Sequence, residues 1–282
     1  MKEFTTDNIR NVCLAGQRGC GKTSLADAIA FATGVNSRIG RVDDGSSLFD
    51  YTDGELSRKS SLSSKLMAGT WQDKKINLLD CPGHADFIGE LLTSMHVCDA
   101  VGVLIDAGSG VEVGTQLQWK MMPEKGLARF FFVNKMEKEN VKWQEALTSI
   151  QNAFGKQAVP VQLPIGEGES FSGIVDLLHM KAYKFSGDTR SEIDIPDDLK
   201  SEAEAQRESL IEAAAESDDT LMEKFFDEGT LEAKDFMTGL RRGIAEGSLF
   251  PVLFGAGGKN IGVKVVLDFI ARPPIRWLRL LL

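Results

Sequence analysis

Hydrophobic side chains along this chain gather in short runs that have the length of buried strands. Residues 100–106 (AVGVLID) and 128–134 (ARFFFVN) are continuous apolar runs. Runs of this kind are typical of strands that are buried on both faces of a parallel sheet. Three further strands are predicted over residues 11–15, 64–69 and 75–80.

Helical periodicity separates these strands. Apolar positions recur at helical spacing in four segments, namely residues 22–32, 86–97, 112–125 and 141–154. The alternation of strand and helix predicts an α/β fold with a doubly wound, mostly parallel sheet. By contrast, residues 35–62 are polar and rich in glycine, serine and aspartate, which predicts a long mobile loop.

The alternation of single strands and helices ends after about residue 157. Residues 158–185 have the pattern of several strands, and residues 196–246 have a helical pattern. The alternation of strand and helix then returns, with a core strand predicted over residues 249–255 and a last helix over residues 263–271. The pattern therefore predicts an α/β domain that an inserted α+β subdomain interrupts.

The expected boundaries of these units lie at the changes of pattern. The main domain is expected over residues 1–157 and 248–274, and the inserted subdomain over residues 158–247. Residues 275–282 are expected to be a truncated tail, because their apolar sequence carries no capping signal.

The composition is that of a soluble globular protein. Of the 282 residues, 43% are hydrophobic and 26% are charged. The apolar runs are too short to span a bilayer, and the N-terminus has no signal-peptide core, so we expect a cytoplasmic protein with no membrane contact. The four cysteines form no C-x-x-C pair, which argues against a disulfide framework or a zinc site. The net charge of −9 argues against a sequence-specific nucleic-acid site.

Residues 16–23 (GQRGCGKT) fit the phosphate-binding loop pattern, and they stand between a predicted strand and a predicted helix. The glycines let successive backbone N–H groups point at an anion, and the helix presents its positive end to the same place. We expect Lys22 to reach the β- and γ-phosphates of a nucleotide and Thr23 to offer a hydroxyl to Mg²⁺. The alternative is a chance glycine-rich turn, which this context disfavours.

Two further motifs follow at predicted strand ends. Asp80 opens the motif DCPGH, where a carboxylate can hold Mg²⁺ through water and the N–H of Gly83 can sense a γ-phosphate. Residues 134–137 (NKME) approximate the guanine-recognition pattern N-K-x-D. The Glu137 carboxylate can accept two hydrogen bonds from the N1–H and 2-amino groups of guanine, donors that adenine lacks.

The order of these motifs resembles that of translational GTPases, and of elongation factor G in particular. The resemblance rests on GQRGCGKT, DCPGH, NKME and GAGGKN, together with GIVDLLHMKAY (173–183) and FPVLFGAGGKNIGVKVVLDFI (250–270). It covers about residues 9–274. Elongation factor G carries an insertion, called G′, where this chain has its predicted inserted subdomain. The resemblance implies an enzyme that binds GTP and GDP, requires Mg²⁺, and hydrolyses GTP when the ribosome stimulates it.

The resemblance also assigns roles to single residues. His84 matches the family's catalytic histidine, which positions the attacking water, and Lys22 acts with it in catalysis. Ser61 matches the threonine that binds Mg²⁺, so the implied metal ligands are Thr23, Ser61 and Asp80. The residues expected to bind the nucleotide are Gly16, Gly19, Gly21, Lys22, Thr23, Ser24, Asp80, Gly83, Asn134, Lys135, Glu137, Gly255, Ala256 and Gly257.

Four residues depart from the family pattern. Glu137 replaces aspartate, Ser61 replaces threonine, and Ala256 replaces the serine beside the base. Gly19 stands where many members carry an aspartate that is associated with a monovalent cation. These departures keep open the alternative of a nucleotide-binding module, or a truncated factor, with little or no turnover. A P-loop ATPase is a further alternative, which Glu137 disfavours.

The insertion indicates a partner. Between residues 191 and 235 the chain has 16 acidic and 4 basic residues. By default such helices present a solvated face. The resemblance implies that they dock a ribosomal stalk protein, and that the ribosome is the machine on which the protein acts. We expect the protein to be a monomer.

Overall fold

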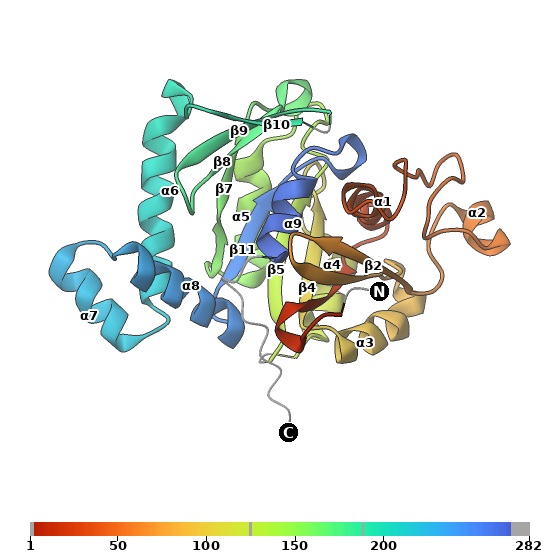
Figure 1. Cartoon of the computed structure of the whole chain (residues 1–282), viewed down its shortest axis with the longest axis horizontal. Coiled ribbons are helices and arrows are strands. Elements are labelled where there is room, and N and C mark those ends of the chain that lie inside the picture. The colour runs from red at the N-terminus through yellow and green to blue at the C-terminus, as the bar shows by residue number, and fades with distance from the viewer. Residues whose placement is uncertain (1–2, 124–125, 188, 272–282) are drawn as a thin grey trace.

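The computed structural model of the chain describes residues 3–123, 126–187 and 189–271. The expected truncated tail over residues 275–282 lies outside these ranges. Within them, no helix combines the length and the apolar character that a membrane span requires. Figure 1 shows the described chain as one large twisted sheet with helices around it and a smaller sheet beside it.

Strands of two sheets make up the framework. The strands of the large sheet are β1 (Ile9–Ala15), β2 (Lys65–Trp71), β3 (Lys74–Asp80), β4 (Ala100–Asp106), β5 (Ala128–Asn134), β6 (Ala158–Pro160) and β11 (Phe250–Phe254). Those of the small sheet are β7 (Gln162–Ile165), β8 (Gly173–Asp176), β9 (Lys181–Ser186) and β10 (Thr189–Ile193). The large sheet has the order β2-β3-β1-β4-β5-β11-β6, and only its β2–β3 pair is antiparallel. This confirms the predicted mostly parallel α/β sheet.

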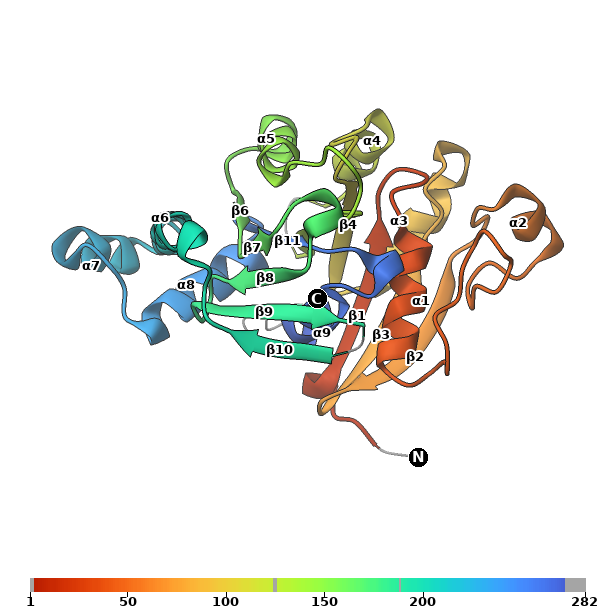
Figure 2. The same ribbon diagram turned by 90° about the horizontal axis from the view of Figure 1, so that it is seen from above.

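Helices cover both faces of the large sheet. Their bounds are α1 (Lys22–Ala32), α2 (Asp53–Arg58), α3 (Ile88–Val97), α4 (Val113–Lys120), α5 (Trp143–Phe154), α6 (Asp197–Ala215), α7 (Asp219–Glu228), α8 (Ala233–Glu246) and α9 (Val263–Ala271). Figure 2 shows α3, α4 and α5 on one face and α1 and α9 on the other. Every residue of β4 and β5 is buried, because helices cover both sides of these strands.

Most predicted elements of the main domain are confirmed, with small shifts at their ends. The strands predicted over residues 100–106 and 128–134 and the helices predicted over residues 22–32 and 263–271 have those bounds in the structure. Because β1, β3, β4, β5 and β11 are neighbours and parallel, the loops at their carboxyl ends meet at one edge of the sheet. All the nucleotide motifs of the sequence lie in these loops.

Two expectations about helices are wrong. The segment predicted as a loop over residues 35–62 contains α2, whose start is fixed by a capping box between Thr52 and Glu55. The helix predicted over residues 112–125 ends at Lys120 instead. Pro123 explains that end, because a proline disfavours helical geometry in the residue before it and cannot donate a hydrogen bond.

The inserted segment begins inside the large sheet. Strand β6, which the sequence pattern assigned to the insertion, pairs with β11 as the last strand of the large sheet. The small antiparallel sheet and the helices α6, α7 and α8 then follow along the chain. The division into two domains stays a prediction, with residues 158–160 structurally part of the larger sheet.

One buried carboxylate connects three parts of the fold. Asp268 on α9 accepts hydrogen bonds from Trp71 Nε1 and Gln72 Nε2, each 2.9 Å long, at the turn between β2 and β3. It also forms an ion pair of 2.6 Å with Arg190 on β10. The hairpin of the large sheet is thereby fastened to the small sheet of the insertion.

Candidate functional site

The glycine-rich loop of residues 16–21 joins β1 to α1. Gly16, Gly19 and Gly21 have positive φ angles of 131°, 86° and 93°. A Cβ on Gly16 would come within 2.4 Å of the Leu104 carbonyl oxygen, and one on Gly21 within 2.3 Å of Asn134 Nδ2. Only glycine fits these positions, so the loop can turn its backbone N–H groups inward around an anion.

Lys22 is the first residue of α1, and only 6% of its surface is exposed. Its Nζ donates to the carbonyl oxygens of Gly16 at 2.8 Å and of Gln17 at 3.1 Å. The ammonium group therefore lies inside the loop. Helix α4 supports the same loop, since Gln118 accepts from the Gly16 N–H at 2.6 Å. A cation held at a helix N-terminus is well placed to attract a phosphate.

The three residues expected to hold Mg²⁺ meet at the start of α1. Thr23 Oγ1 donates to Asp80 Oδ2 at 2.7 Å and lies 3.1 Å from Ser61 Oγ. Asp80 Oδ1 is buried without a hydrogen-bond partner in the described part of the chain. Burial raises the pKa of Asp80 to about 7, because desolvation disfavours the charged carboxylate. Two hydroxyls and an unsatisfied carboxylate oxygen are hard oxygen donors, which fit Mg²⁺.

A second buried carboxylate, which the sequence reasoning missed, faces the same space. Asp50 is 2% exposed, and neither of its carboxylate oxygens has a hydrogen-bond partner among the described residues. It lines the same cavity as Thr23 and Ser61, and burial raises its pKa. Neighbouring carboxylates disfavour each other's charge unless a cation offsets them. The loop sequence does not single out Asp50, because three other aspartates occur between residues 35 and 62.

Asn134 and Lys135 bring the loop after β5 against the phosphate loop. Asn134 Nδ2 donates to the Cys20 carbonyl oxygen, and Asn134 Oδ1 accepts from the Gly257 N–H, each at 2.9 Å. Lys135 Nζ donates to the Gly19 carbonyl oxygen. The residues that these three hydrogen bonds join are 114, 123 and 116 positions apart in the sequence. The contacts thus bring together three loops that are distant along the chain.

Glu137 keeps one carboxylate oxygen unsatisfied. Its Oε2 is buried and has no hydrogen-bond partner in the described ranges. Leaving a buried acceptor unsatisfied is costly unless a ligand or water supplies a donor. This oxygen is therefore available to a polar edge such as the one that guanine presents.

The backbone of residues 255–257 has internal partners. The Gly255 N–H donates to the Val133 carbonyl oxygen, and the Ala256 N–H donates to Ile261, each at 2.9 Å. The Gly257 N–H donates to Asn134. The resemblance to elongation factor G places these three residues among those expected to bind the nucleotide, with a backbone N–H of the loop directed at the guanine carbonyl. In the structure all three N–H groups are engaged within the protein.

Two adjoining cavities open at the phosphate loop. The larger has a volume of about 540 Å³, and its lining includes Arg18, Gly19, Gly21, Lys22, Thr23, Ser24, Asp50, Ser61, Gly83 and Lys135. The smaller has a volume of about 340 Å³ and is lined by Arg18, Arg58, Ser60, Leu62, His84, Asp86 and Phe87. The phosphate loop, the expected metal ligands Thr23 and Ser61, and Gly83 thus share the larger cavity.

His84 faces the smaller of these cavities. Its Nδ1 accepts a hydrogen bond of 3.3 Å from the Asp86 N–H, and its ring lies 6.1 Å from that of Phe87, between centroids. The side chain is 46% exposed. The adjacent Gly83 lines the larger cavity, whereas His84 lines the smaller one.

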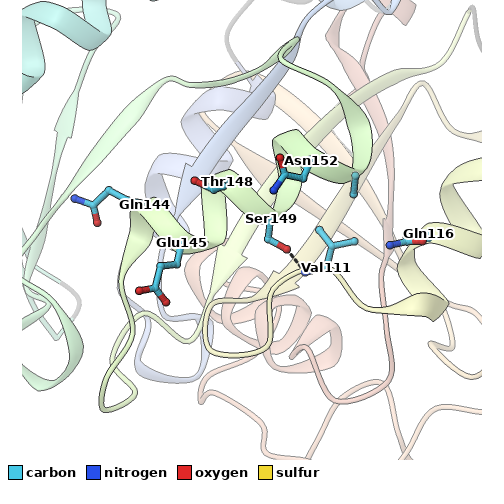
Figure 3. A pocket seen from close by; sticks show the side chains of 8 residues that line it. Val111, Gln116, Gln144, Glu145, Thr148, Ser149 and Asn152 are labelled. Atoms are coloured by element: carbon cyan, nitrogen blue, oxygen red, sulfur yellow. Dashed lines mark hydrogen bonds between the residues drawn. The ribbon is translucent and has the colours of Figure 1, made fainter.

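A further cavity of about 580 Å³ lies between α4 and α5, away from the nucleotide motifs. Figure 3 shows Ser149 on α5 directed at the backbone of Val111, from whose N–H it accepts a hydrogen bond at 2.9 Å. Neutral polar side chains such as Gln116, Thr148 and Asn152 line much of this space, and Glu145 is the charged residue in the lining. A lining of this kind offers no cation to a phosphate, and it contains none of the residues predicted to bind nucleotide.

Comparison with known proteins agrees with this geometry. The sequence profile of the elongation factor Tu GTP binding domain matches residues 7–273. The fold is similar to a solved structure of a protein from Thermus thermophilus, with a TM-score of 0.88 and 29% sequence identity. That similarity covers 95% of this chain and 40% of the Thermus protein. The chain therefore spans less than half the length of this relative.

The family match extends over nearly the whole chain, and the matched region contains the phosphate loop, the DCPGH motif and the NKME motif. Membership of this family implies binding of a guanine nucleotide. The chain therefore belongs to the elongation factor Tu GTP binding domain family, and it is a translational GTPase of the elongation factor G and elongation factor Tu type.

Proposed function

We propose that this chain is the Mg²⁺-dependent, GTP-hydrolysing domain of an elongation factor G-like translation factor, and that the ribosome stimulates it. The observation that carries the proposal is the meeting of Lys22, Thr23 and Asp80 at the loop edge of the parallel sheet. In particular, Asp80 Oδ1 has no hydrogen-bond partner among the described residues, so it can bind a cation or accept a hydrogen bond. The activity and partners of the whole factor are part of the proposal, because the chain spans 40% of its Thermus relative.

The proposed metal ligands are Thr23, Ser61 and Asp80, with Asp50 close enough to add negative charge to the same cavity. Bound Mg²⁺ supplies electrostatic neutralisation of the β- and γ-phosphate oxygens. Ser61 keeps the hydroxyl of the usual threonine and lacks its methyl group. A serine is therefore able to serve as the same type of ligand.

The remaining chemistry belongs to side chains and backbone of this chain. Lys22 binds phosphate oxygens and neutralises charge that develops on them during transfer to water. The Gly83 N–H donates to the γ-phosphate, and His84, once turned from Asp86, orients the attacking water. These groups act by positioning and electrostatics, so the isolated chain is expected to be slow.

The acidic helices of the insertion are proposed to dock a ribosomal stalk protein. Helix α7 presents Phe226 with 77% of its surface exposed, and acidic residues flank it at Glu223, Asp227 and Glu228. An exposed aromatic side chain ringed by charges is typical of an anchor for a protein partner. Acidic charge repels the phosphate backbone of RNA, so a basic protein surface suits these helices better. We further propose a cytoplasmic monomer.

Single-turnover GTP hydrolysis with and without ribosomes tests the proposed function. The expected result is slow Mg²⁺-dependent turnover by the chain alone and a faster rate with ribosomes. Chelation of Mg²⁺ should abolish both. A chain that binds GTP tightly and never hydrolyses it would support the alternative of a nucleotide-binding module, which the position of His84 in the smaller cavity favours. Competition by ATP against bound GTP tests the further alternative of an ATPase.

A further inference from the structure

Arg18, the third residue of the phosphate loop, lies between the two cavities of the site. It lines the larger cavity together with Lys22 and Gly83, and the smaller cavity together with His84. Its backbone lies against the DCPGH loop, since a Cβ on Gly83 would come within 2.7 Å of the Arg18 nitrogen. The residue therefore stands beside the glycine proposed to contact the γ-phosphate.

The Arg18 guanidinium has much unused capacity to donate hydrogen bonds. Its Nη2 donates to the Arg58 carbonyl oxygen at 3.2 Å. A guanidinium carries five N–H donors in a planar fork that matches phosphate oxygens. In the described part of the chain no carboxylate forms an ion pair with Arg18. The positive charge of Arg18 is thus available to bind an anionic ligand.

The surroundings leave room for the side chain to move. Arg18 is exposed, and the next residue, Gly19, has no side chain that could obstruct its movement. The hydrogen-bond acceptor of the guanidinium is a neutral carbonyl at the end of α2, close to the expected metal ligand Ser61 in sequence. Exchange of that hydrogen bond for contacts with a phosphate requires no disruption of the core.

We propose that Arg18 is a catalytic residue for GTP hydrolysis, an assignment that rests on the proposed function. Its guanidinium leaves the Arg58 carbonyl and contacts the γ-phosphoryl group. Water oxygen forms a bond to the γ-phosphorus while the bond from phosphorus to the bridging oxygen breaks. The electron pair stays on GDP, and both water protons go to inorganic phosphate. Arg18 offsets the negative charge that shifts between phosphoryl oxygens during this exchange.

A different function for the same charge is binding of an external anion, such as an RNA phosphate, by Arg18 and Arg58 at the smaller cavity. The contact between Arg18 and Gly83 favours the internal function, because it places Arg18 on the wall of the nucleotide cavity. The two functions differ in whether ribosome-free hydrolysis depends on Arg18.

Single-turnover GTP hydrolysis by the full chain without ribosomes tests the proposal. A catalytic arginine contributes about 10³- to 10⁵-fold to GTPase rates, and we expect a loss of about 10³-fold in Arg18→Ala because the residue is exposed. Arg18→Lys should be intermediate, since it keeps the charge and loses the fork. Arg38→Ala removes the same charge from an exposed site outside both cavities and should retain the wild-type rate.

Binding of GDP with aluminium fluoride gives a second readout, because this pair mimics the transferring phosphoryl group. Wild type should bind the pair at least about 100-fold more tightly than GDP alone. Arg18→Ala should lose that gain while its GDP affinity stays within about twofold of wild type, which also shows that the variant is folded.

Each possible result bears on the assignment. Wild-type basal hydrolysis in Arg18→Ala would overturn it while leaving the proposed GTPase intact. Loss of ribosome-stimulated hydrolysis alone would identify Arg18 as a contact for an external anion and would also overturn it. Absence of hydrolysis in the wild-type chain, with and without ribosomes, would overturn the proposed function together with this assignment.

Discussion

Glu55 is expected to control the stability of the segment that carries Ser61. The Glu55 side chain is fully buried and accepts hydrogen bonds from four groups. They are the Thr52 N–H at 3.2 Å, the Thr52 hydroxyl at 2.8 Å, the Leu62 N–H at 3.2 Å and the Lys65 ammonium at 3.0 Å. One carboxylate thus fixes both ends of the loop that holds α2.

The pKa of Glu55 gives the size of this effect. Burial alone would raise that pKa, but the hydrogen bonds from Lys65, Thr52 and Leu62 lower it from 4.5 to about 2. This difference favours the charged form by about 3 kcal/mol, at 1.36 kcal/mol for each factor of ten. Because the pKa is lower in the folded state, the stabilisation is present above pH 4.5. It is lost as the pH falls from about 4.5 towards 2.

Glu55→Gln keeps the shape of the side chain and removes its charge. We expect the substitution to destabilise the segment by about 2 kcal/mol, less than the value of about 3 kcal/mol for the charge, because the glutamine carbonyl oxygen still accepts part of these hydrogen bonds. The assay is limited trypsin cleavage after the exposed Arg58 and Lys59, followed at pH 7. Where opening and reclosing are fast relative to cleavage, the cleavage rate should be about 30-fold higher in the variant, the factor that corresponds to 2 kcal/mol.

The control is Glu139→Gln, at an exposed position after β5, which should be cleaved at the wild-type rate. Denaturant unfolding as a function of pH gives an independent test. Wild type should lose stability between about pH 4.5 and pH 2, and the Glu55→Gln profile should be flatter by the contribution of this one carboxylate. Identical profiles in the two proteins would refute the reasoning.

Four further predictions concern the nucleotide and the partner. Lys22→Ala should weaken GTP binding by more than about 100-fold with the fold intact, since charged hydrogen bonds contribute up to about 3 kcal/mol; wild-type affinity by calorimetry would exclude this phosphate site. His84→Ala should spare GTP binding and lower ribosome-stimulated hydrolysis by about 10²- to 10⁴-fold, and surviving stimulation would mean that another residue orients the water. Glu137→Asp should tighten GTP and GDP alike, by up to about tenfold, whereas weaker binding would show a pocket adapted to glutamate. Deletion of residues 196–235 should abolish capture of the stalk protein from isolated ribosomal proteins, and RNA binding by the insertion would contradict a protein partner.

The local sequence determined the elements and the order of the motifs. Strands such as β4 and β5 can be predicted from the sequence, because burial on both faces requires an unbroken apolar run. The phosphate loop is readable because Gly16 and Gly21 hold positive φ angles that other residues rarely adopt. Helix α2 was also encoded, in the T-x-x-E capping signature at Thr52 and Glu55, but the polar composition around it concealed a helix of six residues.

Only the tertiary structure decided which polar groups meet. Asp50 is one of several aspartates in a polar loop, and its importance comes from burial beside Asp80. The place of β6 in the large sheet depends on pairing with β11, about 90 residues later, and no local pattern encodes such a partner. Arg18 is, in sequence, a variable position of the phosphate loop. Its position between two cavities depends on the DCPGH loop and α2, which long-range packing brings to it.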